Sequence, residues 1–417
     1  MILIFQELVK DAKAHLGATP QFYASAPGRI DLLNTHQDYK GLPVVPVAIN
    51  LKAHMFAVVN NKQEFEITSR EMEKLGQESK DVFPTEGGEV KGKFFGNYFR
   101  GVVRTLVKRG FRRWERGLRV YVCSDVPVSE GMASSAAIEV CFMTLLNGAF
   151  NLGLTSYDLA ELSYLTETRE LNIPCGRLDQ YSSAFGGGIV LRTRPKVSVE
   201  PISSLDFKFV VINSGIRHET GAIHPVRQDE INRGLAALLS NPALPKRVRT
   251  KLGARYDEVD WEGLDLKSLE PFFFLMPPSS AKRIIYTLEA QRSTGAGIKL
   301  LKGERLSERE LERLLGSSSA QSRYSREELL GRVLNEQHEM LRDLYEVSIP
   351  EIERIRDAAL TAGALGVKIS GAGMGGSVVA LVKSEEDARS VVDSAISAGA
   401  AAARLVLPDR GSEFTRL

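Results

Sequence analysis

The chain has 417 residues, of which 43% are hydrophobic, 25% charged and 7% aromatic. This composition is that of a folded protein and excludes a disordered chain, a collagen-like fibre and a disulfide scaffold. Lys and Arg total 54 against 52 Asp and Glu, so the formal net charge is +2 and gives no reason to expect nucleic acid or an anionic membrane as partner.

The length suits two domains of ordinary size. The three cysteines lack paired spacing, which favours a reducing, cytoplasmic location and excludes a cysteine-based zinc cluster. No stretch approaches the roughly 18 apolar residues that a membrane-spanning helix needs. The amino-terminal residues show helical periodicity and charges too early for a signal sequence, so an amphipathic helix is expected there.

Hydrophobic periodicity predicts mixed strands and helices along the chain. In the first half we expect strands at 43–49, 55–59, 118–123, 188–192 and 207–212, and helices at 133–150 and 157–171. In the second half we expect helices at about 281–302, 325–345, 349–363 and 385–398, and strands at 366–370, 376–382 and 403–407. Ser384 with Asp387 resembles a capping box at the start of the last helix. Residues 317–322 are predicted to be a flexible insert.

The first of three glycine-bearing segments, APGRIDLLNTHQDYKG, is predicted to be a loop over 26–41 before a strand. It contains five polar side chains, those of Arg29, Asp31, His36, Asp38 and Tyr39. If these side chains are held firmly, they could fix a polyhydroxyl ligand. A solvated, charge-rich loop is the alternative interpretation of the same residues.

The second segment, SDVPVSEGMASSAAIEV at 124–140, predicts a strand, a turn of small residues, and a helix beginning near Ser134. Unpaired N–H groups and the positive dipole at such a helix start suit a phosphate, and serine hydroxyls can add a donor or a magnesium ligand. An ordinary core helix capped by Ser134 or Ser135 is the alternative.

The third segment, KISGAGMGGSVVALV at 368–382, formally matches the G-x-G-x-x-G dinucleotide pattern. We reject that match because a strand follows where the pattern requires a helix. A glycine turn between strands either lets backbone approach a ligand or forms a tight hairpin. A Walker lysine motif, a metal-binding histidine spacing and a G-x-S-x-G elbow are all absent from the sequence.

In this order the three segments resemble the signature motifs of the GHMP small-molecule kinases, and within them those of galactokinase and related sugar 1-kinases. GRIDLLNTHQDYKG is similar to G-R-[VI]-N-[LI]-I-G-E-H-x-D-Y-N-G, DVPVSEGMASSAA to D-V-P-x-G-x-G-L-S-S-S-A-A, and ISGAGMGGSVVAL to T-G-A-G-F-G-G-C-x-V-A-L. Further matches occur at 95–103, 174–187, 213–219 and 335–353. The resemblance thus covers nearly the whole chain except about 240–275 and 303–325.

The resemblance implies an α+β, two-domain GHMP kinase fold. Residues 1–205 would form a ribosomal S5-like domain with the nucleotide loop, and 206–417 a ferredoxin-like domain, with the active site in the cleft between them. It implies ATP-dependent phosphorylation of the C1 hydroxyl of galactose, or of a relative altered at C6 such as galacturonate or arabinose, by a monomer or small homo-oligomer. A non-catalytic sensor of sugar and ATP is the alternative. The basic stretch 108–119 raises nucleic-acid binding, but a solvated helix end explains it more simply.

The resemblance also assigns roles to residues. Asp179 matches the catalytic aspartate that accepts the C1 hydroxyl proton, and Arg29 the arginine that pairs with it and stabilises charge on the transferring group. Ser135 and Glu167 match the magnesium ligands. The nucleotide would contact the second segment and two other positions: Gly131, Ala133, Ser134, Ser135, Ala136, Asn97 and Gly373. Ser129 and Glu130 depart from the family pattern, and a carboxylate near a polyphosphate is repulsive unless it points outward.

For the sugar, the resemblance implies contacts from His36, Asp38 and Gly176. Asn34 and Thr35 stand where galactokinases carry Gly and Glu, and that glutamate binds the C6 hydroxyl in the family. Thr35 is shorter and neutral, so it cannot supply this charge-assisted bond, and a sugar altered at C6 loses nothing by the change. His224 stands where the family has a sugar-contacting tyrosine.

Overall fold

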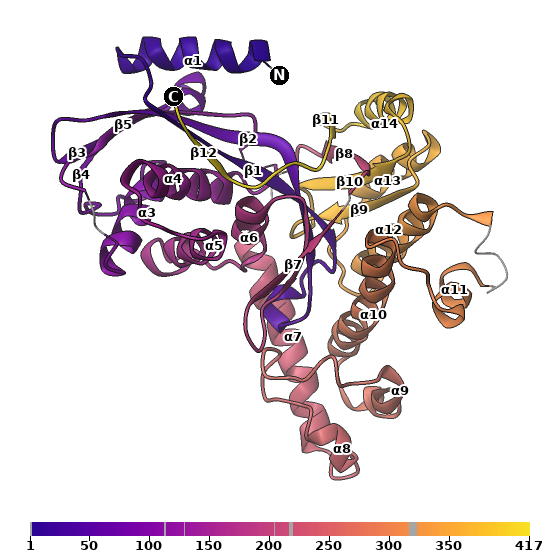
Figure 1. The fold of residues 1–417 in the computed structure, drawn as a ribbon. Coiled ribbons are helices and arrows are strands. Elements are labelled where there is room, and N and C mark those ends of the chain that lie inside the picture. The colour runs from indigo at the N-terminus through magenta and orange to yellow at the C-terminus, as the bar shows by residue number, and fades with distance from the viewer. Residues whose placement is uncertain (1, 112–113, 129, 204, 217–219, 317–322) are drawn as a thin grey trace. The chain divides into compact units, whose positions relative to one another are not determined.

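The computed structural model describes residues 2–111, 114–128, 130–203, 205–216, 220–316 and 323–417 (Figure 1). The chain forms two compact units, each assembled from separate stretches. Unit 1 comprises Met1–Arg29, Ala48–Gly187 and Asp409–Leu417, and unit 2 comprises Ile30–Val47 and Gly188–Pro408. The domain boundary predicted after residue 205 stays a prediction.

Unit 1 is built on a sheet with the strand order β12-β1-β2-β5-β3-β4. The pair β3–β5 is parallel, whereas β1–β12, β2–β5 and β3–β4 are antiparallel. The first two strands are long, and both continue across the boundary between the units. The strands are β1 (Phe22–Leu33), β2 (Val45–Val59), β3 (Glu64–Ser69), β4 (Lys80–Pro84), β5 (Leu118–Ser124) and β12 (Glu413–Arg416).

Helices cover both faces of this sheet (Figure 1). On one face α1 packs Leu8, Ala12 and Leu16 against Phe56 and Tyr121 of the sheet. Helices α3 to α6 lie on the other face. Successive residues of a strand point to opposite sides, so apolar residues on this second face also need cover. The helices are α1 (Ile2–Leu16), α2 (Arg70–Lys74), α3 (Asn97–Lys108), α4 (Ser134–Phe150), α5 (Ser156–Leu165) and α6 (Leu178–Phe185).

Unit 2 contains a four-stranded antiparallel sheet in the order β11-β8-β10-β9. With the helices that connect the strands, this is the βαββαβ order of a ferredoxin-like fold. Helices α13 and α14 pack beside it, as Figure 1 shows, over an apolar core that includes Ile352, Val367 and Val391. The elements are β8 (Lys208–Asn213), α13 (Pro350–Thr361), β9 (Gly366–Ser370), β10 (Ser377–Val382), α14 (Glu385–Ser397) and β11 (Ala402–Val406).

The rest of unit 2 consists of a hairpin and a layer of helices. Strands β6 and β7 pair with each other, and Leu191 of β6 pairs with Val44. Helices α7 and α10 share a second core around Ile231 and Trp261. The elements are the 3-10 helix η1 (Asp38–Lys40), β6 (Gly188–Arg192), β7 (Ser198–Ile202), α7 (Thr220–Ser240), α8 (Lys246–Arg249), α9 (Leu266–Leu269), the 3-10 helix η3 (Glu270–Leu275), α10 (Pro278–Leu301), α11 (Glu308–Leu315) and α12 (Arg326–Asp343).

Many predicted elements are confirmed. The helix starts at Ser134, the strand follows the third glycine segment, and Ser384 with Asp387 forms the predicted capping box. The predicted strands at 43–49 and 55–59 are one continuous strand, β2. The prediction for 317–322 falls outside the described residues.

Two predictions were wrong. The segment predicted as a loop over 26–41 lies in strand β1 as far as Leu33, because this strand is buried along nearly its whole length and carries polar residues without alternation. The helix predicted at 157–171 ends at Leu165 and continues as a π-helix, η2 (Thr166–Glu170). The Thr166 hydroxyl donates to the Leu162 carbonyl, and such back-bonding distorts a helix locally.

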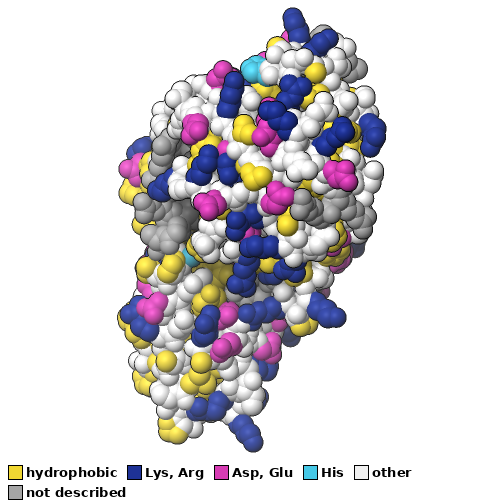
Figure 2. All heavy atoms as spheres, turned by 90° about the vertical axis from the view of Figure 1, so that its left-hand side faces the viewer, with side chains coloured by type: hydrophobic (Ala, Val, Ile, Leu, Met, Phe, Trp, Pro, Cys, Tyr) yellow, Lys and Arg dark blue, Asp and Glu magenta, His cyan; other side chains and the backbone are white. Residues whose placement is uncertain are grey.

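On the face drawn in Figure 2, Lys and Arg side chains are interspersed with Asp and Glu side chains, as the balanced composition leads one to expect. Among the described residues, no helix is both long and apolar enough to cross a membrane.

The close approach of α12 to β9 depends on glycine. A Cβ at Gly331 would overlap the Leu365 carbonyl oxygen, which is backbone and cannot step aside. We predict that Gly331→Ala lowers the free energy of unfolding by about 1–3 kcal/mol, the usual effect of overpacking. Gly295→Ala in α10 is the control, because a Cβ there meets nothing within 4 Å and alanine favours a helix. Urea unfolding of both variants tests this, and equal stabilities would contradict it.

Candidate active site

Arg29 ties two elements of unit 1 together. It lies on β1, is 7% exposed, and donates from Nε to Oδ1 of Asp179 at 2.8 Å, with Nη2 also 2.8 Å from the same oxygen. Its Nη1 donates to the Gly131 carbonyl at 2.6 Å. One guanidinium therefore fixes both the predicted catalytic carboxylate and the segment that precedes α4. Among the described residues, Oδ2 of Asp179 has no hydrogen-bond partner and stays available.

The start of α4 has the features of an anion site. Ala133, its N-cap, has a left-handed backbone (φ 59°), and no side chain caps the helix. The carbonyls of Gly131 and Met132 both accept from Arg29. Because C=O and N–H point in opposite directions across a trans peptide, the N–H groups of the next residues point away from Arg29. They add to the uncapped N–H groups of Ser134, Ser135 and Ala136 in the first turn, which favour an anion.

Three carboxylates lie near one another beside this helix start. Glu167 on η2 accepts from Nε2 of Gln180 at 2.6 Å, and the nearby hydroxyl of Ser135 and thiol of Cys175 act to lower its pKa. Glu139 on α4 is fully buried, and neither of its oxygens has a hydrogen-bond partner among the described residues. Burial raises the pKa of Glu139 well above its ordinary value, and the negative charges of Glu167 and Asp179 add to this. Burial likewise raises the pKa of Glu167.

This arrangement fits a magnesium ion that is held chiefly by phosphates. Among the described residues, no group of three or more His, Cys, Asp or Glu side chains could hold a metal alone. Magnesium in phosphoryl-transfer sites needs only one or two protein oxygens, its remaining ligands being phosphate and water. Ser135 and Glu167 supply such oxygens side by side, and the unpartnered Oε1 of Gln180 adds a third.

A pocket of about 460 Å³ lies elsewhere in unit 1, with Phe94, Phe95, Tyr98 and Leu171 in its wall. Asn97 also lines it, but its amide pairs with Gly92 and with both backbone groups of Lys91. Its side chain therefore holds the loop at 91–92, and a direct nucleotide contact by Asn97 stays a prediction. The mostly apolar and aromatic wall suits a flat ring.

In unit 2, Thr35 and His36 are held by groups from distant segments. Lys368 donates from Nζ to Oγ1 of Thr35 at 2.6 Å, and the Tyr286 hydroxyl donates to the Thr35 carbonyl at 2.6 Å. Nε2 of His36 lies 3.0 Å from the Ala372 carbonyl. Since a carbonyl only accepts, Nε2 carries the proton and Nδ1 is an acceptor. Burial lowers the pKa of His36 well below its ordinary value, so the ring is neutral at pH 7.

Asn34, where the resemblance led us to expect Gly, adopts a left-handed backbone with φ 67°. Asn is among the few residues other than Gly that tolerate this conformation. Its amide donates to the Pro43 carbonyl and to Gln291, so the departure from Gly keeps the turn and adds two anchors.

The aromatic residues around His36 form the floor of this region. The ring of His224 lies 5.0 Å from that of His36 and 5.5 Å from that of Tyr39. His224 therefore belongs to the same aromatic cluster as His36, and its contact with a sugar stays a prediction. Tyr39 and Tyr345 share a hydrogen bond of 2.7 Å, and the Nζ of buried Lys40 lies over the ring of Tyr345 at 4.8 Å. Asp38, at the start of η1, is partly exposed, and its carbonyl accepts from Thr193 at 2.9 Å.

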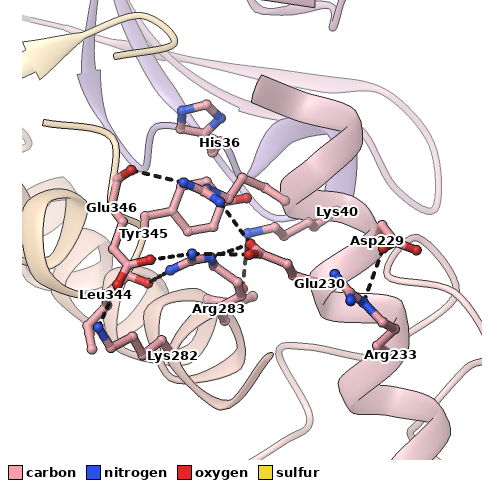
Figure 3. A network of polar contacts seen from close by, with 12 residues as sticks. His36, Lys40, Asp229, Glu230, Arg233, Lys282, Arg283, Leu344, Tyr345 and Glu346 are labelled. Carbon is pink, nitrogen blue, oxygen red and sulfur yellow. Dashed lines mark hydrogen bonds and ion pairs between the residues drawn. The ribbon is translucent and has the colours of Figure 1, made fainter. Parts of the chain in front are cut away.

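A network of ion pairs supports this floor (Figure 3). Arg283 is 1% exposed and donates to Glu230 at 2.7 Å and to Glu346 at 2.7 Å. Arg227 also binds Glu230, at 3.0 Å, and Lys282 binds Glu346 at 2.6 Å. Because several fixed partners satisfy the buried guanidinium, the network holds α7, α10 and the residues after α12 in one geometry.

The two remaining predicted residues lie in turns. Gly373 has φ 86°, and a Cβ there would meet Val347, so the turn after β9 needs glycine at this point. Gly176 lies in unit 1, three residues before Asp179. The structure thus places Thr35, His36, Asp38, His224 and Gly373 in unit 2, and the other predicted site residues in unit 1.

Sequence reasoning missed three residues of these groups: Glu139, Gln180 and Lys368. A glutamate inside an apolar helix and a lysine inside the apolar strand β9 are both signals, because charged side chains are rarely buried without a role. The hydroxyl of Thr35 and its partner Lys368 are 333 residues apart, so their pairing follows only from the fold.

Three family models match this chain. They are the GHMP kinases N terminal domain at 97–187, the GHMP kinases C terminal model at 311–401, and the galactokinase galactose-binding signature at 13–58. The first model lies within unit 1 and the second within unit 2, and the third spans β1 and η1.

Similar proteins include galactokinases. One from Limosilactobacillus fermentum is 28% identical over 91% of this chain and 90% of its own length, and one from Thermotoga neapolitana is 29% identical over 86% and 88%. Among solved structures, Lactococcus lactis galactokinase complexed with galactose superposes with a TM-score of 0.74 at 23% identity, covering 99% of this chain and all of that one. A Methanococcus jannaschii mevalonate kinase gives 0.65 at 15% identity, covering 93% and 98%.

The unpartnered carboxyl of Glu139 makes a prediction about stability. Since its pKa is raised in the folded state, the unfolded chain loses this proton first, and stability falls as pH rises above about 4.5. We expect Glu139→Gln to be more stable than the parent at neutral pH, with a difference that shrinks toward pH 4. The control is Glu312→Gln at an exposed position of α11. Thermal unfolding from pH 4 to 8 measures both, and a difference independent of pH would contradict the prediction.

Proposed function

We propose that this chain is a GHMP kinase that transfers the terminal phosphoryl group of ATP to the C1 hydroxyl of galactose or a galactose-related sugar. The galactokinase signature at 13–58 and the galactokinases among its relatives support this reaction. The observation that carries the proposal is that Arg29 donates hydrogen bonds both to Asp179 and to the Gly131 carbonyl, just before α4.

Phosphoryl transfer depends on positioning and on neutralising charge, rather than on covalent chemistry by the protein. Arg29 occupies one oxygen of Asp179, which leaves Oδ2 to orient the C1 hydroxyl and accept its proton late in the transfer. The same guanidinium lies beside the anion site of α4 and can stabilise charge on the transferring group.

For the nucleotide, we propose that the phosphates bind the uncapped N–H groups of α4 and that the base occupies the pocket near Tyr98. We propose Ser135 and Glu167 as the magnesium ligands. The metal would neutralise charge that develops on the phosphates, and Glu139 beneath it would face less repulsion.

For the sugar, we propose contacts from Thr35, His36, Asp38 and His224 of unit 2. Neutral His36 would accept a hydrogen bond from a sugar hydroxyl through Nδ1, which lies 3.5 Å from the Tyr39 hydroxyl, since its Nε2–H is already bound to Ala372.

We propose a cytoplasmic location. Cys123, Cys141 and Cys175 are all free thiols, which suits a reducing compartment.

The catalytic pair can be tested by two substitutions. We expect Asp179→Ala to lower sugar-dependent ADP release about 100-fold or more, because a positioned proton acceptor contributes this much. We expect Arg29→Lys to lower it about tenfold or more, because one ammonium cannot reproduce the planar fork that binds both partners.

Arg104→Lys is the matched control. Arg104 also binds one carboxylate, Glu170, and one backbone carbonyl, that of Gly88, but it lies on α3 away from Asp179. We expect its kcat to stay within about threefold of the parent, as for a partly exposed ion pair. Turnover by Asp179→Ala at the parental rate, with an unchanged circular-dichroism spectrum, would remove Asp179 from the reaction.

A further inference from the structure

The open edge of strand β9 is bound by side chains of helix α12. Strand β9 stands at the end of the order β11-β8-β10-β9, so every second backbone N–H of β9 points away from the sheet. Oδ1 of Asn335 accepts from the Val367 N–H at 3.0 Å, and Nδ1 of His338 accepts from the Ile369 N–H at 3.3 Å. Asn335 and His338 are three residues apart and therefore share one face of α12, which lies along β9 (Figure 1). Two side chains thus take the place of a neighbouring strand.

His338 forms its bond to β9 only as a neutral ring. A backbone N–H can only donate, so Nδ1 must offer a lone pair and the ring proton is on Nε2. Nε2 lies 2.8 Å from Oε1 of Glu353 on α13 and donates to it. The imidazole therefore links α12, β9 and α13, and it is fully buried. A second proton, on Nδ1, would set two N–H groups against each other, that of the ring and that of Ile369.

The surroundings of His338 also oppose a second proton. Burial is the main cause that lowers the pKa of His338, and the positive charges of Arg356 and Lys368 act in the same direction. Glu353 favours a charged ring, but Arg342 shares that carboxylate at 3.4 Å. The charged side chains that act on His338 or on Glu353 are Glu353 and Arg356 of α13, Arg342 and Asp343 of α12, and Lys368 of β9.

We propose that His338 is an acid-sensitive latch: a proton that binds Nδ1 breaks the hydrogen bond from Ile369, and the edge of β9 then separates from α12. The proton comes from solvent, and no covalent bond other than the new N–H is made or broken. The open form binds this proton near pH 6.5, about the ordinary pKa of histidine, whereas the closed form resists it. The closed form therefore loses stability as the pH falls below about 6.5.

The third glycine segment follows β9 directly, so opening of this strand reaches it. Oγ of Ser370, the last residue of β9, accepts from the Asp31 N–H at 2.9 Å. Two residues later, the Ala372 carbonyl accepts from Nε2 of His36 at 3.0 Å. All of these residues belong to unit 2. The latch thus connects the pH of the solvent with the turn that carries His36.

Hydrogen exchange of the full chain at pH 7.5 and pH 5.5, corrected for the intrinsic exchange rates, tests the latch. We expect the opening constant of peptides that cover β9 to rise about threefold to tenfold at the lower pH, because opening takes up one proton there. Peptides that cover the central strand β8 are the internal control and should change by less than about twofold. An unchanged β9, or an equal rise in β8, would overturn the proposal.

Two variants separate the titration of His338 from the hydrogen bond itself. His338→Gln keeps an acceptor and a donor but does not titrate, so we expect the rise in β9 to shrink below about twofold. Asn335→Ala is the matched control, because it removes the companion bond to Val367 and leaves His338 in place. We expect its opening constant to be higher by about fivefold or more at both pH values, with the pH dependence retained.

The outcomes are distinct for each variant. If His338→Gln keeps the whole pH dependence of β9, or if Asn335→Ala loses it, the latch is overturned. If His338→Gln does not fold, the exchange of the parent chain still decides the question. The measurement needs neither ATP nor a sugar, so its result does not depend on the proposed function.

Discussion

The guanidinium of Arg29 is the constraint on which the chemistry of unit 1 depends. Its two bonds to one oxygen of Asp179 fix that carboxylate on α6, and its bond to Gly131 fixes the segment before α4. The left-handed N-cap of α4 and its uncapped first turn follow from this attachment, because the carbonyls of the segment are turned toward β1. The side chain is nearly buried and its contacts with Asp179 and Gly131 lie within unit 1, so the protein itself fixes this arrangement.

Much of this could be predicted from the sequence, for physical reasons that differ between elements. The start of α4 and the strand after the third glycine segment were predictable because small residues and apolar periodicity mark them locally. The motif around Arg29 suggested a role that remains a prediction, whereas its place in a strand could not be predicted from the motif. A strand buried on both faces has no alternation, and the polar residues in β1 make it look like a loop.

What the sequence could not show depends on contacts between distant residues. Lys368 meets Thr35, and Glu139 lies near Glu167 and Asp179, only because the fold brings these segments together. The π-helix after Leu165 is another such case, since periodicity alone continues the helix. It turns Glu167 inward, where Ser135 and Gln180 hold it. Local sequence patterns thus locate the helices and strands, whereas contacts between distant residues decide which polar side chains interact with one another.

Unit 1 buries a group of negative charges beside Asp179. In unit 1, Glu139 and Glu167 lie close to Asp179, and the pKa values of both glutamates are raised because their negative charges are buried together. Buried charge is costly unless a partner compensates it. A cation that accompanies ATP would compensate this group of carboxylates, so the buried charge of unit 1 supports the proposal of a magnesium ion there.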